Sequence, residues 1–271
     1  MDFGVVVSSH WGTKQILESG CLADSLGLDF FLVTDHYITP VSDSSVDAWA
    51  ILAALAARTE RVTLGTCVTP IPFRPPQILA KVVATVDQIS GGRTVLGVGA
   101  GWHKPEFDAY SSWDEDRVRV AKTVEGIQLM TKLWTSTEPF DFEGKYYSSK
   151  GAILNPKPVH QPHPPLWFGG RGEYLLKKVA AKYGEAWLPP VPGMSEEEYA
   201  RILSLVHGEG KARPLRAMFN GDFPEIQSNI EKYAKMGFEG VMLVRTPYET
   251  LPSVMREFEA LARSYKRGMS R

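Results

Sequence analysis

The chain has 271 residues, 44% of them hydrophobic, and a formal net charge of -1. This length suits one large domain, and the even mixture of charges gives no basic footprint for nucleic acid or an anionic membrane, so we expect a small-molecule substrate. Its two cysteines, Cys21 and Cys67, stand in unrelated contexts, which argues against a disulfide framework, and we expect no metal site.

The N-terminal stretch "MDFGVVVSSHWG" has an acidic residue at position 2 and an apolar run too short for a signal peptide. No segment of the sequence approaches membrane-spanning length. We therefore expect a cytoplasmic protein.

Short β-branched apolar runs alternate with longer segments of helical period along the whole chain, which is typical of β/α units on a parallel sheet. Strands are predicted at residues 3–7, 30–34, 61–68, 94–99, 165–169, 185–189, 215–219 and 240–244. Eight such units close a barrel without an edge strand. The sequence therefore predicts an α/β fold, a single (β/α)8 TIM-barrel domain over residues 1–271.

The helical segments carry periodic and terminal signals. Near the C-terminus one apolar stripe falls at helical spacing, formed by Leu251, Val254, Met255, Phe258, Leu261 and Ala262. Gly27, Gly184 and Gly237 each follow the last periodic residue of a helix, where a left-handed cap is expected.

One connection, between the fourth and fifth predicted strands, is longer than the rest. Residues 138–164 include "FDFEGKYYSSKGAILNPKPVHQPHP", with strand-like pieces, a turn and a proline-rich path. An excursion of this length indicates either a lid or rim of the active site, or a structural hairpin covering the barrel's edge.

Barrel enzymes work at the face where their strands end, so the residues after each strand are the candidates. These segments are "SSHWG", "DHY", "TPIPFR", "AGWHKPEF", "GGRGE" and "LPPVPG". Aromatic side chains among them suggest an apolar cavity for a hydrophobic or planar substrate. We expect the substrate pocket to include Ser8, His10, Trp11, Tyr37 and Trp187.

His36 follows the second strand and is the candidate for proton transfer near neutral pH, with the adjacent Asp35 orienting it. The alternative is a structural histidine that caps a helix or satisfies a loop carbonyl. His160 and His163 lie in the proline-rich path and are expected to be solvated.

Glycines follow the fourth and fifth strands. Gly97, Gly99 and Gly101 alternate, so they either leave a trough for a flat ring or allow tight packing of the barrel layers. Residues 169–172, "GGRG", open directly into a helix, where free N–H groups and the helix dipole suit a phosphate; a plain turn is the alternative.

Taken together, "TDH" (34–36), the segment 53–93 ending in "SGGR", "LGVGAGWHKPEF" (96–107) and "PKPVHQPHPPLWFGG" (156–170) resemble the bacterial luciferase-like monooxygenase family. The likeness runs in collinear order over nearly the whole chain. It is closest to the branch of oxidoreductases that depend on the deazaflavin coenzyme F420.

The resemblance implies a (β/α)8 barrel with an insertion in its rim and an isoalloxazine-type ring in its mouth. A non-proline cis peptide, here between Cys67 and Val68, would support the ring. His36 would lie at the reacting face and move the proton that accompanies hydride transfer. The residues carried over to the cofactor site are Thr66, Cys67, Val68, Gly99, Ala100, Gly101, Trp102, Gly169, Gly170, Arg171 and Gly172.

This sequence departs from the sugar-phosphate dehydrogenases of that branch. Trp102 stands where they carry a glutamate, and an indole cannot do the acid work of a carboxylate, which argues against glucose 6-phosphate as substrate. The same fold also serves FMN-dependent monooxygenases fed by a separate reductase, and cofactor-binding proteins without turnover. Relatives often form homodimers, and the apolar helical segment 48–57 permits one, although the same pattern is equally that of a buried barrel helix.

Overall fold

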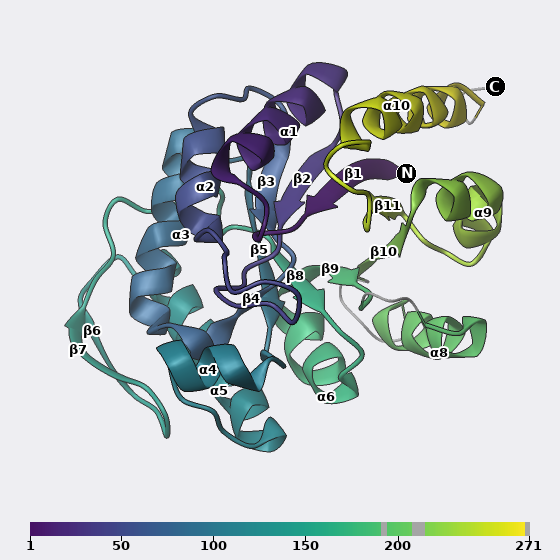
Figure 1. The fold of residues 1–271 in the computed structure, drawn as a ribbon. Coiled ribbons are helices and arrows are strands. Elements are labelled where there is room, and N and C mark those ends of the chain that lie inside the picture. Colours follow the sequence, from purple (N-terminus) through teal and green to yellow (C-terminus); the bar gives the residue numbers. More distant parts are fainter. Residues whose placement is uncertain (191–193, 208–214, 269–271) are drawn as a thin grey trace.

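The computed structural model describes residues 1–190, 194–207 and 215–268. Parallel strands form a closed barrel, and helices surround it (Figure 1). The strand order is β3-β2-β1-β11-β10-β9-β8-β5, and pairing of β3 with β5 completes the ring. The TIM-barrel prediction is confirmed.

Every predicted strand is present within one or two residues of its predicted ends, apart from the third. The strands of the barrel are β1 (Asp2–Val7), β2 (Phe30–Val33), β3 (Thr63–Thr66), β5 (Thr94–Gly99), β8 (Leu166–Gly169), β9 (Gly184–Leu188), β10 (Arg216–Gly221) and β11 (Gly240–Leu243). The third run divides: β3 ends at Thr66, and the short β4 (Thr69–Pro70) follows. Between them the Cys67–Val68 peptide bond is cis, as the family resemblance implies.

The helices lie outside the strands, and the longer ones bury apolar residues against the barrel. They are α1 (Thr13–Leu26), α2 (Ala48–Ala56), η1 (Ile71–Phe73), α3 (Pro76–Ser90), α4 (Lys104–Tyr110), α5 (Asp116–Thr135), α6 (Glu173–Leu175), η2 (Leu176–Ala180), α7 (Ala181–Tyr183), α8 (Glu196–His207), α9 (Phe223–Lys235) and α10 (Leu251–Gly268). Among the described residues, no helix combines the length and the apolar character needed to cross a membrane.

Helix α10 confirms the predicted apolar stripe, because Leu251, Met255, Phe258 and Ala262 are buried along it. The glycine caps are confirmed at two of three positions. Gly27 and Gly237 have φ values of 75° and 98°, in the left-handed region.

Gly184 is not a left-handed cap, so that prediction was wrong. Its φ is -82°, and it is the first residue of β9. A side chain there would place its Cβ 2.7 Å from the carbonyl oxygen of Ala180. Glycine is therefore required at this position by close packing rather than by backbone conformation.

Two apolar layers follow from the alternation of side chains along each strand. The barrel interior holds Phe30, Leu32, Val95, Trp167, Ala186, Leu188, Met218, Met242 and Val244. The larger outer layer lies between the strands and the helices. A strand residue's position in this alternation therefore decides whether its side chain can reach the barrel mouth.

The long connection forms an antiparallel hairpin, β6 (Phe140–Glu143) and β7 (Ser148–Ala152), outside the helical ring (Figure 1). Gln77 of α3 donates to Ser148 and Ser149, and Glu125 of α5 accepts backbone N–H groups at 145–147. These contacts correspond to the covering hairpin among the two alternatives, rather than to a lid over the strand ends.

Candidate functional site

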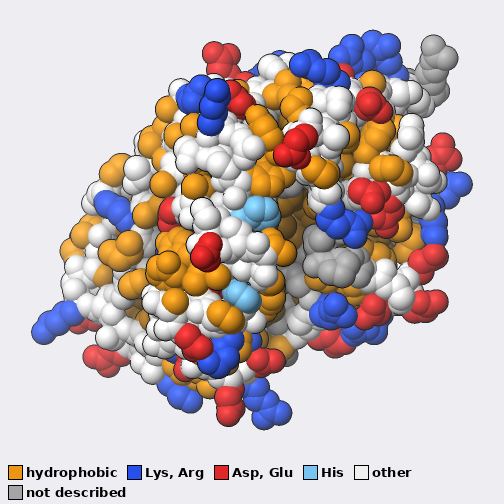
Figure 2. Space-filling view, in the orientation of Figure 1, with side chains coloured by type: hydrophobic (Ala, Val, Ile, Leu, Met, Phe, Trp, Pro, Cys, Tyr) orange, Lys and Arg blue, Asp and Glu red, His pale blue; other side chains and the backbone are white. Residues whose placement is uncertain are grey.

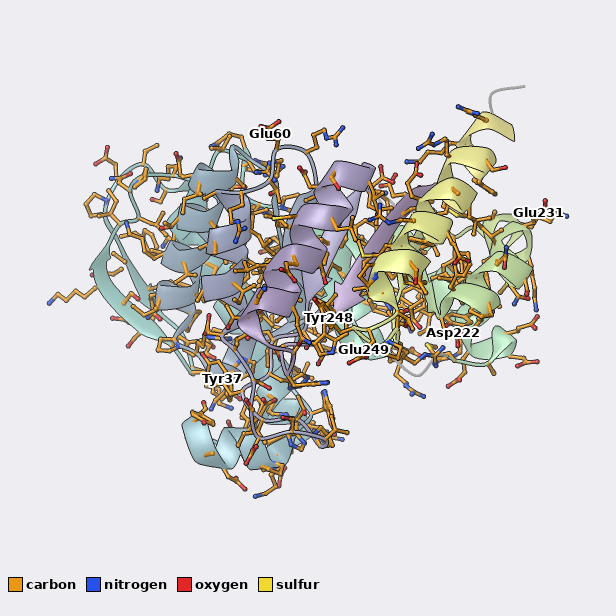
Figure 3. All side chains as sticks on the ribbon, turned by 45° about the horizontal axis from the view of Figure 1, so that its top comes forward. Tyr37, Glu60, Asp222, Glu231, Tyr248 and Glu249 are labelled. Atoms are coloured by element: carbon orange, nitrogen blue, oxygen red, sulfur yellow. The ribbon has the colours of Figure 1, made fainter. Side chains whose placement is uncertain are left out.

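The residues that follow the strands lie on one side of the barrel. In Figure 3, Tyr37, Asp222, Tyr248 and Glu249, which follow β2, β10 and β11, lie below the middle, whereas Glu60, which precedes β3, lies at the upper edge. Figure 2 shows a hollow near the middle of the molecule, with hydrophobic side chains at its floor and a histidine at its edge. The candidate site is this mouth of the barrel.

His36 contacts a buried carboxylate from a different part of the chain. Its Nδ1 lies 2.8 Å from Oε1 of Glu106, in the first turn of α4. The other carboxylate oxygen, Oε2, accepts the backbone N–H of Tyr37 at 3.1 Å. The Glu106 side chain is 0% exposed, whereas the His36 ring is partly accessible. A solvent-accessible imidazole held by a buried carboxylate is suited to proton transfer.

Asp35, which we predicted to orient His36, forms a different set of contacts. Phe30 and Leu32 of β2 point into the barrel, so by alternation Asp35 points outward and His36 inward. The buried Asp35 carboxylate accepts two hydrogen bonds from Arg74, at 2.7 Å each, and one from the Thr69 hydroxyl at 2.7 Å. The partner of His36 is Glu106 instead.

Glu106 is a residue of the candidate site that the sequence analysis did not single out. It stands within "AGWHKPEF", 70 positions after His36, and a carboxylate in the first turn of a helix ordinarily reads as favourable to the helix dipole. The sequence signal that could have identified Glu106 was its position after a predicted barrel strand, which is also the position of His36.

Tyr37 belongs to the same outward network as Asp35, although it was predicted in the substrate pocket. Its hydroxyl donates to Asp47 at 2.7 Å and accepts from Arg74 at 3.0 Å. Burial raises the pKa of the Tyr37 phenol to about 12. The ring packs edge-on against Phe73 and Tyr110. The phenol is therefore a neutral structural link between these loops.

The bulge between β3 and β4 lies over the inner layer. Cys67 and Val68 are partly buried against the barrel interior, while Thr66 is fully buried and its hydroxyl oxygen lies 3.0 Å from that of Thr69. Burial raises the pKa of the Cys67 thiol to about 12, which leaves it a poor nucleophile. Of the three predicted cofactor residues, two thus lie at the mouth and Thr66 lies behind it.

The alternating glycines make room for this bulge. A Cβ at Gly97 would lie 1.8 Å from the Thr66 carbonyl oxygen, and one at Gly99 would lie 2.6 Å from Val68. Gly169, on β8, would place its Cβ 2.7 Å from the same valine. Tight packing is therefore the correct alternative at Gly97 and Gly99, and Val68 occupies the space that a trough would have offered.

After β5 the backbone turns at Gly101, where φ is 82° and a Cβ would collide with the Phe107 ring. This turn brings Trp102 to the surface, where its side chain is 61% exposed. The Trp102 ring meets His36 edge-on, with the centroids 5.6 Å apart. Ala100 and Trp102 thus extend from the strand that carries Gly99 toward His36.

The predicted phosphate cradle lies between β8 and the helical segment that α6 begins. Cβ atoms at Gly170 and Gly172 would meet no atom within 4 Å, so there is open space beside both. Arg171 is exposed and lies 3.3 Å from Glu198 of α8. The backbone geometry therefore suits an anion, while the arginine has an acidic partner.

Trp187 does not line the mouth, so its assignment to the substrate pocket was wrong. Its neighbours Ala186 and Leu188 point into the barrel, so Trp187 points outward and is 0% exposed. Its indole N–H donates to the carbonyl of Gly170 at 2.7 Å. Residues 191–193 of the "LPPVPG" segment lie outside the described residues.

The residues after β1 lie near the mouth. Ser8 and His10 are hydrogen-bonded to each other through Oγ and Nδ1. Trp11 packs edge-on against Tyr248, with the centroids 5.8 Å apart. These three predicted pocket residues therefore lie between the loops after β1 and β11.

Asn220 is a second residue that the sequence analysis missed. By alternation with Met218 it points into the barrel, and its Nδ2 donates to the carbonyls of Pro189 and Pro190. Among the described residues its Oδ1 has no hydrogen-bond partner, although it is buried. A buried acceptor of this kind is suited to a ligand N–H. Across all the residues that the structure describes, no group of three or more His, Cys, Asp or Glu side chains lies together as potential metal ligands.

Comparisons with known proteins agree with this architecture. The sequence is 34% identical over 205 residues to the F420-dependent glucose-6-phosphate dehydrogenase of Microbacterium testaceum (strain StLB037), which covers 74% of this chain and 60% of that protein. It is 35% identical over 174 residues to the FMNH(2)-dependent dimethylsulfone monooxygenase of Pseudomonas putida, covering 62% and 47%. The chain thus spans 54–63% of the length of the first dehydrogenases that it matches.

Two solved structures share the fold at low identity. Monooxygenase RslO1 from Streptomyces bottropensis has a TM-score of 0.83 and 22% identity, covering 98% of this chain and 100% of that one. An F420-dependent secondary alcohol dehydrogenase in complex with an F420-acetone adduct has a TM-score of 0.80 and 21% identity, covering 95% and 97%. The sequence profile described as luciferase-like monooxygenase matches residues 1–218. The chain therefore belongs to the luciferase-like monooxygenase family.

Proposed function

We propose that the protein is an oxidoreductase that transfers a hydride between coenzyme F420 and a hydrophobic or planar organic substrate, with His36 as proton donor or acceptor. The observation that carries this proposal is the His36–Glu106 pair at the barrel mouth, with Nδ1 and Oε1 2.8 Å apart and the carboxylate buried. The similarity to F420-dependent dehydrogenases supports the choice of cofactor.

The residues at the mouth fit such a cofactor. Val68 offers an apolar support for a flat ring, and the buried Oδ1 of Asn220 offers an acceptor for a ring N–H. Gly170 and Gly172 leave open space at a helix start, where a phosphate is favoured. When bound, the deazaflavin supplies the group that accepts or donates the hydride.

His36 would handle the proton that accompanies hydride transfer. In alcohol oxidation its ring takes the hydroxyl proton, and in reduction of a conjugated double bond it returns one. Trp102 contacts the imidazole edge-on and remains largely exposed, so it would form an aromatic wall beside the reacting atoms. This wall supports an apolar substrate rather than glucose 6-phosphate.

The test begins with absorption spectra of the purified protein titrated with F420 and with FMN. We expect saturable binding of F420, and oxidation of its reduced form by at least one member of a panel of enones, imines, nitroarenes and aldehydes. Glucose 6-phosphate serves as the substrate control. Tight binding of FMN without affinity for F420 would overturn the choice of cofactor.

A second candidate is an FMN-dependent monooxygenase of the same fold, which the similarity to the dimethylsulfone monooxygenase favours. That activity would need a separate reductase, and oxygen uptake coupled to substrate would identify it. Binding of either cofactor without turnover on the whole panel would instead indicate a carrier protein. In each case we propose a homodimer, which the molar mass in solution tests.

A further inference from the structure

The hydrogen bonds around Glu106 restrict where its oxygens can accept. Oε2 accepts the Tyr37 backbone N–H at 3.1 Å, and Oε1 faces Nδ1 of His36 at 2.8 Å. A carboxylate only accepts hydrogen bonds, so the ring nitrogen that faces it must carry a hydrogen. Among the described residues nothing hydrogen-bonds to the other ring nitrogen, Nε2 of His36.

We propose, on the basis of the proposed function, that Glu106 is a positioning residue that fixes the neutral His36 ring with its hydrogen on Nδ1. The free lone pair of Nε2 is then the atom that exchanges a proton with substrate. In alcohol oxidation the carbinol hydrogen leaves with its electron pair to the cofactor, and Nε2 takes the hydroxyl proton. A C=O bond forms, and His36 becomes an imidazolium that Glu106 stabilises.

Within the described ranges, Glu106 is the one carboxylate that contacts the His36 ring. Asp35, its chain neighbour, points outward and is bound by Arg74 and Thr69. His103 contacts Trp102 rather than His36, with ring centroids 5.1 Å apart. Trp102 itself contributes a ring edge. The carboxylate of Glu106 therefore decides which ring nitrogen is protonated.

The variant Glu106→Gln tests directly whether Glu106 decides which ring nitrogen of His36 carries the hydrogen. The Tyr37 N–H still needs an acceptor, so the amide oxygen should remain there and the amide N–H2 should face Nδ1 of His36. A donor at that position forces the hydrogen of the ring onto Nε2, which then has no lone pair for the substrate proton. The ring would be in place but in the wrong tautomer.

The first readout is nitrogen–proton correlation NMR of the histidine rings in the protein without cofactor. We expect the neutral His36 ring to carry its hydrogen on Nδ1 in the unmodified protein and on Nε2 in Glu106→Gln. A hydrogen on Nε2 in the unmodified protein, or an unchanged tautomer in the variant, overturns the proposal. The measurement on the unmodified protein keeps the proposal falsifiable even if the variant does not fold.

The second readout is kinetic. Glu106→Gln should lower kcat by about 100-fold or more, the usual contribution of a positioned acid or base, with little change in KM. Glu106→Asp retains an acceptor and should keep the Nδ1 tautomer with part of the activity. A kcat unchanged in a variant whose tautomer has switched overturns the catalytic importance of Nε2.

The chain contains a matched control. The buried Asp87 accepts the backbone N–H of His160 itself at 2.9 Å and lies 3.0 Å from its Nδ1, so a second histidine ring faces a buried carboxylate elsewhere in the fold. Asp87→Asn should alter the ring signals of His160 and leave those of His36, and kcat, unchanged. If His36 switches its tautomer but the unmodified enzyme transfers no hydride, the proposed function fails while the assignment of Glu106 stands.

Discussion

Gly97 and Gly172 are both glycines, but the first is tightly packed and the second is open to solvent. A Cβ at Gly97 would lie 1.8 Å from the Thr66 carbonyl oxygen and 2.8 Å from its carbonyl carbon, in backbone that cannot move freely. A Cβ at Gly172 would meet no atom within 4 Å, and its φ of -71° suits any residue.

We therefore expect Gly97→Ala to lower the free energy of unfolding by about 3 kcal/mol, at the upper end of the range for overpacking. Gly172→Ala should change it by less than about 0.5 kcal/mol, as for an open surface position. Urea denaturation of both variants measures the difference. Equal stabilities would mean that the bulge after β3 moves away from β5 without cost.

At this scale the sequence could place His36 at the end of the second strand but could not reveal its partner. The pairing with Glu106 joins two strand ends, and it depends on the inward direction of His36 after β2. Adjacent residues of an extended chain point to opposite faces, which is why Asp35 was the wrong choice. The same alternation removes Trp187 from the mouth, although it stands within a strand that reaches it.

Among the elements, the end of β2 is joined to the segment between η1 and α3 through one buried ion pair. Asp35 is 1% exposed and Arg74 is 15% exposed, and the guanidinium also donates to the Tyr37 hydroxyl. Burial alone would lower the pKa of Arg74, but the adjacent carboxylate of Asp35 raises it above its ordinary value. The Arg74 guanidinium is therefore held in its charged form, and both of its terminal nitrogens donate to the Asp35 carboxylate.

Arg74→Met should lower the free energy of unfolding by about 3–5 kcal/mol, because it leaves the Asp35 carboxylate buried without its cation. The control is Lys177→Met, which removes the exposed pair with Glu173 and should cost less than about 1 kcal/mol. Thermal and urea unfolding compare the two. A loss at Arg74 no larger than at Lys177 would show that water replaces the guanidinium at Asp35.

The hairpin connection is tied to α3 by a second ion pair, which titrates. The hydrogen bond that the His160 ring donates to Asp87 raises the pKa of His160 above its ordinary value of about 6.5. The folded state therefore holds this proton more tightly than the unfolded chain, and the resulting stability is present below pH 6.5 and lost as pH rises through the folded-state pKa. We had expected His160 to be solvated, and this contact corrects that.

The free energy of unfolding should thus fall with pH above 6.5 more steeply in the unmodified protein than in His160→Gln. Urea titrations at a series of pH values from 5.5 upward measure both slopes. His163→Gln is the control, because in the described part of the chain its Nδ1 contacts the carbonyl of Pro164 rather than a carboxylate. Parallel curves for the unmodified protein and His160→Gln would contradict a contribution from the Asp87 pair.

Element boundaries were predictable wherever burial on both faces gives an uninterrupted apolar run, as at Thr94–Gly99. The boundaries of the third strand were less predictable, because the break after Thr66 depends on a cis peptide that residue composition alone does not reveal. Gly184 resembles a helix cap in the sequence because it directly follows the last residue of a helix. A glycine that begins a strand at that point gives the same sequence pattern.

At the scale of the whole molecule, the barrel architecture determines how a ligand bound at the mouth changes the free energy of unfolding. Residues around the mouth come from strands far apart in sequence, such as Val68, Gly170 and Asn220, so a ligand that bridges them binds only the folded chain. At a concentration 100 times its Kd such a ligand stabilises the fold by about 2.7 kcal/mol.

We expect F420 at that concentration to raise Tm by about 5 °C or more, given a shift of about 2–4 °C per kcal/mol for large domains. FMN at the same concentration should give a smaller shift. Differential scanning fluorimetry, with riboflavin as the phosphate-free control, separates ring binding from phosphate binding. If riboflavin raised Tm as much as FMN does, the segment 169–172 would be excluded as the phosphate site.

The crowding around Val68 also affects how this protein can be mutated. Gly97, Gly99 and Gly169 come from two neighbouring strands, and all three face the methyl groups of this one valine. Their substitutions are therefore epistatic: alanine at Gly99 or Gly169, harmful alone, should become tolerable once Val68 is trimmed to alanine. Engineering libraries that reshape this protein must vary the valine and its glycines together, since single-site scans would discard the compatible combinations.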